Sequence, residues 1–409
     1  MRALRVLHVI GGGDTGGAMT HLLPLLCGLQ RAGCDAHLLC LGEGGLAERA
    51  GGRGLPVAVL PMRSARDPRV VPSLRRLLAG GPPGMAGLEG APPVVDALQA
   101  TTAPSSRWDV VHTHGMRANL PVRMVLRTLR ERPCLFTTVH SDLLLDYPSS
   151  GLARVYQALD RLTLSGVDRI ICVSDALRVL LAGRGYPQER LLTVRSGLEM
   201  TGDGVGEGGP PPTAGGPPRP PRIGTIARLV AVKDLDLMLE VAGLLRRTHP
   251  EVQLLIVGDG PEAGRLATRA ANLGLEDTVR FMGRLDGVGP VLDALDVYMV
   301  TSAFEGGVSM AVLEAMACGL PVVTTAAGGV AEAVVDGATG YVVERSEDRG
   351  ALAAALAERA ASLLDDPALR ARMGAAGARR VRARFTAEQT AAQTLRAYER
   401  CLAERGGPS

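Results

Sequence analysis

The sequence predicts an α/β protein made of two doubly wound parallel-sheet domains. Short apolar runs alternate with longer helical stretches, and the same rhythm restarts after a Gly/Pro-rich break near the middle of the chain. Apolar runs separated by helices are typical of strands buried on both faces, as in a parallel sheet. With 409 residues the chain is also long enough for two domains.

The first predicted domain covers residues 1–200. Its predicted strands are Val6–Ile10, Ala36–Leu41, Val57–Leu60, Val110–Val111, Leu135–Val139 and Ile170–Val173. The stretch Ala18–Arg31 reads as a helix that ends near Gly33, because glycine is favoured just after a helix. A Gly/Pro-rich insertion at about residues 80–107 interrupts this domain, and we assign it no function.

A second predicted domain, residues 223–385, follows a Gly/Pro-rich segment at 201–222. That segment is too poor in apolar side chains to bury a core, so we interpret it as a linker. The predicted strands of the second domain are Ile223–Ala227, Leu254–Val257, Val279–Phe281, Val297–Val300, Val322–Thr325 and Tyr341–Val343. A C-terminal helix within residues 386–409 is expected to pack back towards the first domain.

The composition excludes several classes of protein. A net charge of +3 and an aromatic content of 3% argue against a nucleic-acid partner. The seven cysteines are widely spaced and lack a CxxC pair, which indicates small buried hydrophobes in a reducing cytoplasm rather than a zinc or disulfide framework. No apolar window is long enough for a membrane span, so a cytoplasmic location is predicted.

Ligands in open α/β sheets bind beyond the carboxyl ends of the strands, so residues after predicted strands are candidate site residues. The first such segment is Gly11–Gly17, where glycine amides and a helix N-terminus would favour an anion. It also fits the GxGxxG pattern of dinucleotide sites, with Glu43 as the ribose acid. The pattern does not separate NAD from a sugar phosphate, and a turn without a ligand stays open.

The second segment is Arg228–Lys233, which contains the only lysine of the chain. An ammonium beside a guanidinium at a strand end suits a diphosphate, although an ordinary solvated lysine is the alternative. The single lysine also excludes two other site types. Leu229 stands where a YxxxK dehydratase or epimerase needs tyrosine, and Val232 stands where a GK[ST] phosphate loop needs glycine.

The third segment runs from Glu305 to Glu314. Glu314 falls in a predicted helix among apolar side chains, where a buried carboxylate needs a hydrogen-bonding partner such as a ribose diol. The Gly306–Ser309 turn leads into that helix, so its free N–H groups would bind phosphate. An exposed helix edge is the alternative for Glu314.

No metal site is predicted. Asp234 and Asp236 resemble a DxD metal motif, but N-capping of a helix by one of them is the preferred interpretation. His112 and His114 share one face of a predicted strand, yet the sequence places no third ligand near them. We interpret these two histidines as structural or as polar residues of a cleft.

Taken together, the motifs resemble glycosyltransferase family 4, whose members are retaining enzymes of GT-B architecture, with two Rossmann-like domains facing across a cleft. The resemblance covers most of the chain outside the two Gly/Pro-rich stretches. It rests on Gly16-Gly17-Ala18 with His21, Asp109-Val-Val-His112-Thr-His114-Gly115, Thr137-Thr-Val-His140, Ile171-Cys-Val-Ser174, Arg228-Leu-x-x-x-Lys233, Val257-Gly-Asp-Gly260-Pro261 and Glu305 to Val323.

The resemblance implies catalytic roles for four residues. Arg228 and Lys233 would bind the donor diphosphate and stabilise the leaving group. Glu305 would lie against the donor sugar, and His140 would face the sugar and the acceptor. Glu305 and Glu314 are one residue further apart than in the family, so the position of Glu305 and of the phosphate-binding amides is open.

The resemblance also implies the donor-binding set. Glu314 would bind the ribose, and Val308 and Ser309 would meet the phosphate from the turn before its helix. Gly16 and Gly17 would close over the phosphate from the first domain. The base would lie near residues 283–285, and no metal or other cofactor is required.

The function implied is transfer of a hexosyl or N-acetylhexosaminyl group from a nucleoside diphosphate sugar to a hydroxyl acceptor, with retention, in cell-envelope polysaccharide or glycolipid synthesis. A UDP-sugar is favoured and a GDP-sugar is the second choice. Three alternatives remain: a sugar-nucleotide epimerase of similar fold, an NAD-dependent oxidoreductase and a non-catalytic nucleotide-sugar-binding subunit.

The expected acceptor is a saccharide or a lipid-linked saccharide. Five arginines interleaved with apolar residues follow His114, namely Arg117, Arg123, Arg127, Arg130 and Arg132. Such a stretch would rest on anionic lipid, which predicts peripheral contact with the inner face of the membrane. A solvated helix face is the preferred interpretation of the same pattern, and the lipid-facing one is the alternative.

Overall fold

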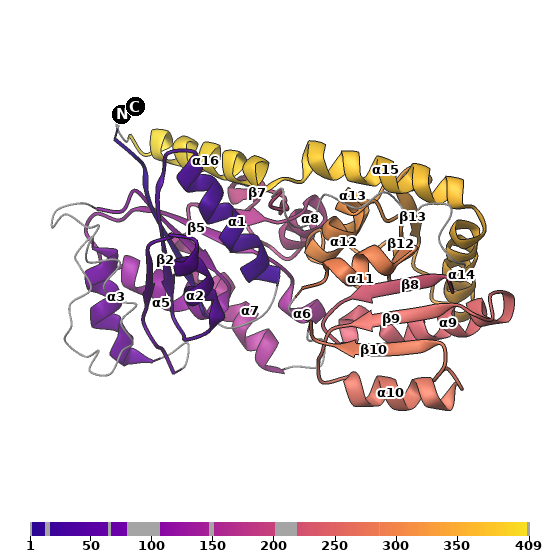
Figure 1. The fold of residues 1–409 in the computed structure, drawn as a ribbon. Helices are drawn as coiled ribbons and strands as arrows, with labels where there is room; N and C mark the ends of the chain where they lie inside the picture. The colour runs from indigo at the N-terminus through magenta and orange to yellow at the C-terminus, as the bar shows by residue number, and fades with distance from the viewer. Residues whose placement is uncertain are drawn as a thin grey trace. The chain divides into compact units, whose positions relative to one another are not determined.

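The computed structural model describes residues 2–12, 17–63, 67–79, 107–146, 151–200, 219–285 and 287–406. The chain forms two compact units, each built on one parallel sheet with helices along it (Figure 1). Residues 1–196 and 387–409 make up the first unit, and residues 197–386 make up the second. The predicted class, two doubly wound α/β domains, is confirmed.

The first unit holds a seven-stranded sheet in the order β3-β2-β1-β4-β5-β6-β7. Its strands are β1 (Arg5–Ile10), β2 (Asp35–Cys40), β3 (Val57–Val59), β4 (Val110–His114), β5 (Cys134–Val139), β6 (Arg169–Cys172) and β7 (Leu191–Thr193). Every neighbouring pair is parallel. Sequence reasoning missed β7, a three-residue edge strand without an apolar run long enough to mark it.

Helices α1 (Gly17–Arg31) and α16 (Ala387–Glu404) lie side by side in the first unit (Figure 1). A side chain could not fit at Gly28 of α1, because its Cβ would stand 2.7 Å from the Cβ of Ala391 in α16. The other α-helices among the described residues of this unit are α2 (Gly45–Gly52), α3 (Val71–Leu78), α5 (Met116–Leu126), α6 (Leu143–Asp146), α7 (Gly151–Thr163) and α8 (Asp175–Gly183). The last helix of the chain therefore completes the first unit.

The second unit holds a six-stranded sheet in the order β10-β9-β8-β11-β12-β13. Its strands are β8 (Arg222–Ile226), β9 (Gln253–Val257), β10 (Val279–Gly283), β11 (Val297–Val300), β12 (Val322–Thr325) and β13 (Gly340–Val343). Its helices are α9 (Leu235–Thr248), α10 (Ala263–Asn272), α11 (Gly289–Ala294), α12 (Met310–Ala317), α13 (Val330–Ala333), α14 (Arg349–Asp365) and α15 (Pro367–Arg384).

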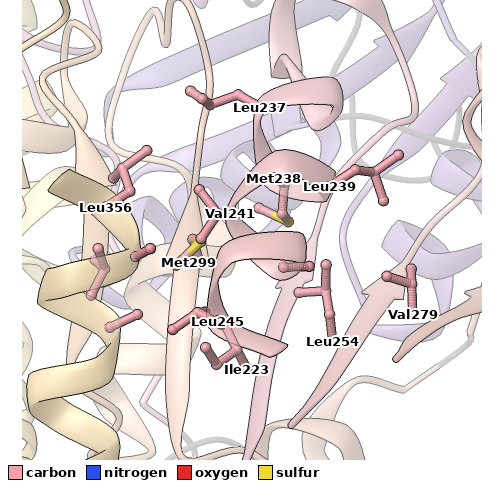
Figure 2. Close-up of a cluster of buried hydrophobic side chains, with 14 of the residues drawn as sticks. Ile223, Leu237, Met238, Leu239, Val241, Leu245, Leu254, Val279, Met299 and Leu356 are labelled. Atoms are coloured by element: carbon pink, nitrogen blue, oxygen red, sulfur yellow. The ribbon is translucent and has the colours of Figure 1, made fainter. Parts of the chain in front are cut away.

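Apolar packing fixes α9 against this sheet. Figure 2 shows Met238, Val241 and Leu245 of α9 turned towards Ile223 and Met299 of the central strands. These side chains are buried, as expected for the apolar stripe of an amphipathic helix. The segment just before α9, which contains Lys233, is thereby anchored at the end of the sheet.

The boundary between the units differs from the predicted one at residue 200. Residues 197–200 belong to the second unit, where the Leu198 amide donates to the Phe385 carbonyl at 2.8 Å. Most of the predicted linker (201–218) and of the predicted insertion (80–106) lies outside the described residues. Within the described part of the chain, we find no helix that is both long and apolar enough to cross a membrane.

Candidate functional site

The order of the strands in the second unit selects one end of the sheet as the candidate site. From β8 the chain moves outwards through β9 and β10, then returns to the other side of β8 with β11. Ligands bind in such sheets where the strand order reverses, beyond the carboxyl ends of the strands. The loop after β8 carries Arg228 and Lys233, and the loop after β11 carries Glu305. Three of the predicted catalytic residues therefore follow two adjacent strands.

Lys233 and Glu305 form a direct ion pair. The ammonium Nζ donates to Glu305 Oε1 at 2.5 Å, and Ser302 Oγ donates to the same oxygen at 2.6 Å. Both charged side chains are largely buried, so the pair is held more firmly than a surface ion pair. Sequence reasoning assigned the two residues separate roles and missed their contact. The only available signal was that each stands just beyond a predicted strand; that the two strands are neighbours is a finding of the structure.

The backbone of Glu305 is fixed from the loop after β12. Its carbonyl accepts a hydrogen bond from the Gly329 amide at 3.0 Å. Gly328, with φ of 54°, passes so close that a Cβ would stand 2.2 Å from the same carbonyl oxygen, and only glycine fits there. The segment from Glu305 to Glu314, one residue longer than in the family, thus starts at a residue whose backbone is held in place by the loop after β12.

Arg228 is the second cation of this site. Its side chain is exposed, and its guanidinium has no hydrogen-bond or ion-pair partner among the residues that the structure describes. The next residue is held in place, because the Leu229 amide donates to the Asp259 carbonyl at 2.9 Å. An exposed guanidinium on a fixed backbone is well suited to bind an anionic ligand.

Glu314 lies on α12, half-buried, and its carboxylate accepts no hydrogen bond from the described residues. Burial raises the pKa of the Glu314 carboxyl to about 7. Burial, with smaller contributions from the charges of Glu314 and Glu305, also raises the pKa of Tyr298 on β11. Both carboxylates therefore lie within electrostatic reach of one hydroxyl, near the carboxyl end of β8.

We expect Glu314→Gln to change how the stability of the ligand-free protein depends on pH. The folded pKa of about 7 lies above the ordinary value of 4.5, so ionisation of Glu314 opposes folding. The protonated Glu314 carboxyl therefore contributes to the free energy of unfolding in full below about pH 4.5. This contribution, on the order of 2–3 kcal/mol, is lost as the pH rises through 7. Denaturant unfolding of wild type and variant from pH 5 to 8 measures this difference.

Glu347→Gln is the matched control, because Glu347 is exposed and makes no side-chain bond among the described residues. It should reproduce the wild-type pH profile. If Glu314→Gln also reproduces the wild-type pH profile, burial does not raise the pKa of the Glu314 carboxyl.

The remaining predicted donor-binding residues divide into three groups. Val308 turns its side chain into the hydrophobic core, so only its backbone is left to meet a ligand. Ser309, just before α12, lines one small pocket together with Lys233 and Glu305. Gly17 is the first residue of α1, whereas Gly16 lies outside the described residues.

The predicted capping role of the Asp234–Asp236 pair is wrong. Asp234 stands before α9 with a left-handed φ of 46°, but its side chain makes no capping hydrogen bond. Its carboxylate instead accepts from Arg345 at 3.2 Å and from Arg349 at 3.0 Å. Asp236 is paired with Arg265 at 2.6 Å. Both carboxylates are thus engaged in ion pairs that bind other elements to α9.

A separate cavity of about 370 Å³ opens at the carboxyl ends of β1, β4 and β5 in the first unit. Gly12, His114, Arg117 and His140 are among its lining residues. Burial, and to a lesser extent the neighbouring His21, lowers the pKa of His140 to about 3, so the ring is neutral at physiological pH. A neutral imidazole in a largely apolar cavity is suited to hydrogen-bond a hydroxyl group.

His112 and His114 have a third histidine beside them, contrary to the sequence-based interpretation. Strand pairing sets His8 of β1 against His112 of β4. His8 Nδ1 lies 3.0 Å from His114 Nε2. One nitrogen from each of the three rings lies within 4.8 Å of the others. No local sequence pattern predicts this cluster, because it depends on which distant strands pair.

The predicted lipid-facing arginine cluster is wrong for Arg123. This side chain is fully buried and forms an ion pair with Asp160, Nη1 to Oδ1, at 2.8 Å. The same Nη1 donates to Thr163 Oγ1 at 2.9 Å, and Tyr186 donates to the other oxygen of Asp160 at 2.8 Å. Arg117, Arg127, Arg130 and Arg132 are exposed. Arg123 ties α5 to α7 instead of facing solvent.

Two family models match the chain one after the other. Residues 16–197 match the glycosyl transferase 4-like domain, and residues 214–380 match the glycosyl transferases group 1. The chain belongs to the family 4 glycosyltransferases. Both halves of this glycosyltransferase are thus accounted for, and the predicted family is confirmed.

Curated relatives of this glycosyltransferase include synthases and mannosyltransferases. N-acetyl-alpha-D-glucosaminyl L-malate synthase of Bacillus anthracis is 36% identical over 36% of this chain and 37% of its own length. Alpha-maltose-1-phosphate synthase of Mycolicibacterium smegmatis is 26% identical over 95% of this chain and 96% of its own length. The stronger identity thus applies to little more than a third of either protein.

Solved structures show that the transferase has the GT-B fold. HepE of Anabaena, determined in complex with UDP, superposes with a TM-score of 0.72 at 17% identity, covering 97% of this chain and 100% of that one. Sucrose-phosphate synthase of Thermosynechococcus elongatus gives a TM-score of 0.71 at 20% identity, covering 98% and 100%. At this level of identity the likeness concerns the fold.

Proposed function

We propose that this protein is a retaining glycosyltransferase that moves a hexosyl or N-acetylhexosaminyl group from a nucleoside diphosphate sugar to a hydroxyl of a saccharide or lipid-linked acceptor. The observation that carries the proposal is the contact of Lys233 with Glu305 where the strand order of the second unit reverses, with Arg228 exposed in the same loop as Lys233. Two cations and a carboxylate suit a diphosphate and the sugar attached to it.

In this proposal the second unit binds the donor. Arg228 and Lys233 bind the diphosphate and stabilise the negative charge that develops as it leaves. The backbone of Val308 and the hydroxyl side of Ser309 face the phosphates, Glu314 accepts hydrogen bonds from the ribose, and the base lies beside residues 283–285. Gly16 and Gly17 contribute from the first unit.

The chemical step is mainly one of positioning and charge stabilisation. The cavity of the first unit holds the acceptor, and His140 hydrogen-bonds a hydroxyl there. No covalent nucleophile is assigned. In this proposal the acceptor hydroxyl attacks the sugar on the same face from which the diphosphate departs, so the configuration is retained without a covalent intermediate. The two side-chain cations supply the positive charge that a metal ion supplies in other diphosphate sites, so the proposal includes no metal.

Two comparisons support a nucleotide-sugar donor. HepE of Anabaena has been determined with UDP-glucose, and a relative in Corynebacterium glutamicum is named as GDP-mannose-dependent. We favour a UDP-sugar, with a GDP-sugar as the second choice. A putative colanic acid biosynthesis glycosyltransferase of Escherichia coli is also a relative, which supports a role in polysaccharide synthesis. The proposal places this role in the cytoplasm, in the synthesis of cell-envelope polysaccharide or glycolipid.

Calorimetric titration of UDP, GDP, ADP, TDP and NAD into the full chain tests the proposal. One nucleoside diphosphate should bind, and the matching sugar donors should then be consumed in the presence of acceptor. Binding of NAD alone would contradict the proposal and favour an oxidoreductase. Conversion of the donor without acceptor would identify an epimerase, and binding without any turnover would identify a non-catalytic subunit.

The proposal also includes peripheral contact with anionic lipid. Met124 on α5 and Leu162 on α7 are 58% and 74% exposed, and these two helices touch. Arg127 and Arg130 follow α5 and are exposed, and Arg127 donates to the hydroxyl of Ser165 just beyond α7. Apolar side chains flanked by arginines suit the boundary between lipid head groups and acyl chains.

We expect Arg127→Glu/Arg130→Glu to weaken binding to vesicles that contain phosphatidylglycerol by about tenfold or more, since each basic residue near an anionic surface contributes about 1 kcal/mol. Co-sedimentation measures this binding. Arg247→Glu, an exposed position on α9, is the control and should bind like wild type. Sedimentation that ignores the anionic lipid content would remove the membrane contact from the proposal.

A further inference from the structure

A continuous hydrogen-bonded chain of aromatic side chains crosses the interior of the first unit. It begins at Tyr398 of α16, whose hydroxyl lies 3.3 Å from His8 Nε2. His8 Nδ1 lies 3.0 Å from His114 Nε2, and His114 Nδ1 lies 3.3 Å from His140 Nε2. The chain thus connects the last helix with the imidazole that lines the cavity.

The three histidines that this hydrogen-bonded chain passes through, His8, His114 and His140, are neutral. Burial is the main cause that lowers the pKa of His8 to about 3 and of His140 to about 3, and it lowers the pKa of His114 well below its ordinary value. A neutral imidazole carries one N–H donor and one unprotonated acceptor nitrogen. Each contact needs one donor and one acceptor, so the orientation of a single contact fixes all the others.

The two contacts of the Tyr398 hydroxyl set this orientation. Its oxygen lies 2.5 Å from His112 Nδ1 but 3.3 Å from His8 Nε2. Hydrogen bonds donated by O–H are shorter than those donated by N–H. The hydroxyl has one proton, so it donates to His112 and accepts from His8. Of the two short contacts of His112, the one to Tyr398 is the shorter, 2.5 Å against 2.7 Å to Thr138 Oγ1, and a phenol is the stronger O–H donor. His112 therefore accepts from Tyr398 on Nδ1, carries its proton on Nε2 and donates to Thr138.

The rest of the chain follows from this assignment. His8 holds its proton on Nε2, so its Nδ1 accepts from the Nε2–H of His114. His114 Nδ1 in turn accepts from the Nε2–H of His140. The Nδ1 of His140 is left without a proton, and it has no partner among the described residues. The His140 ring is part-exposed and lines the cavity.

We propose that Tyr398, acting through His8 and His114, holds His140 in the Nε2–H tautomer, so that His140 offers an unprotonated Nδ1 to a hydroxyl of the ligand. Tyr398, His8 and His114 are positioning residues in this proposal, and His140 is the residue that touches the ligand. The identity of that hydroxyl, on a sugar or an acceptor, rests on the proposed glycosyltransferase function. The tautomer itself does not.

The same three histidines have ring nitrogens close enough to surround a transition-metal ion. In a metal site, however, the acceptor nitrogens point at the ion, whereas here His8 Nδ1 and His114 Nε2 point at each other. Both nitrogens of His112 are already bonded, to Tyr398 and to Thr138. The contacts therefore favour the hydrogen-bonded chain, and metal binding is an outcome of the test.

Long-range ¹H–¹⁵N correlation spectra of the full chain with ¹⁵N-labelled histidine test the proposal. His140 should appear as the neutral Nε2–H tautomer, with its signals assigned by their loss in His140→Gln. Tyr398→Phe removes only the hydroxyl that orients the chain. We expect the nitrogen shifts of His140 to move towards values averaged over both tautomers in this variant. Cys401→Ala changes the contact of the same helix with Cys134 but removes no member of the hydrogen-bonded chain, so it should leave these shifts unchanged.

Kinetics give the second readout. Tyr398→Phe should lower kcat/KM for the acceptor roughly tenfold, as expected when about 1.4 kcal/mol of orientation is lost, and Cys401→Ala should not. If Tyr398→Phe fails to fold, His8→Gln interrupts the same chain. Unchanged His140 shifts in a folded variant, or zinc bound at the three histidines after addition of Zn²⁺, would overturn the proposal. A shift of the His140 signals in a protein without transferase activity would contradict the proposed function and leave the tautomer chain standing.

Discussion

Lys233→Ala is expected to reduce turnover of the nucleotide-sugar donor by about 10²–10³-fold, the effect of removing one group that stabilises developing negative charge. Lys233 is the only lysine of the chain, and it shares the loop after β8 with Arg228, whose side chain is exposed. The variant should also bind the nucleoside diphosphate more weakly. Initial rates and calorimetry measure the two effects separately.

Stability has to be separated from catalysis in this variant. Removing Lys233 leaves the Glu305 carboxylate buried, with the Ser302 hydroxyl as its one remaining side-chain donor among the residues that the structure describes. An uncompensated buried charge is destabilising. The double variant Lys233→Ala/Glu305→Gln removes that charge, so it should recover thermal stability without recovering diphosphate affinity. Wild-type turnover in a folded Lys233→Ala protein would end the role assigned to Lys233.

Asp160→Asn should cause a large loss of stability. Asp160 is the carboxylate that balances Arg123, whose side chain is fully buried, and it also accepts the hydroxyl of Tyr186. Breaking a buried ion pair costs about 3–5 kcal/mol, because the remaining charge has no counter-ion. For a domain of this size the loss corresponds to a fall in Tm on the order of 10 °C. Differential scanning calorimetry is the measurement.

Glu388→Gln provides the comparison for Asp160→Asn. Glu388 also pairs with an arginine, Arg31, at 2.9 Å, but both side chains are more than half exposed. Exposed ion pairs contribute little, so this variant should unfold nearly as wild type does. Equal midpoints for the two variants would show that burial does not distinguish the Arg123 pair from a surface pair.

Local sequence signals were sufficient for most of the fold. Apolar runs between helices marked twelve of the strands, and Val297–Val300 was placed with its observed bounds. The end of α1 near Gly33 also agrees, since that residue has a left-handed φ of 88°. These features depend on residues that are close together in the sequence, so they can be predicted without knowing how distant segments pack.

Contacts between distant segments were not predictable in the same way. The sequence placed Lys233 and Glu305 after different strands, but their pairing depends on β8 and β11 being neighbours in the sheet. The burial of Arg123 depends on Asp160 arriving from α7. His8 joins His112 and His114 only through the register of β1 with β4. In each case the missing information was the order and register of the strands.

The return of α16 to the first unit has a consequence for synthesis on the ribosome. The second unit is one uninterrupted segment, residues 197–386, whereas the first unit needs residues 387–409 as well. Tyr398 and Cys401 belong to its core. Translation proceeds from the N-terminus, and domains usually fold in that order. Here the segment made second is the first to be complete, and the nascent first unit waits for the final eighteen-residue helix to emerge.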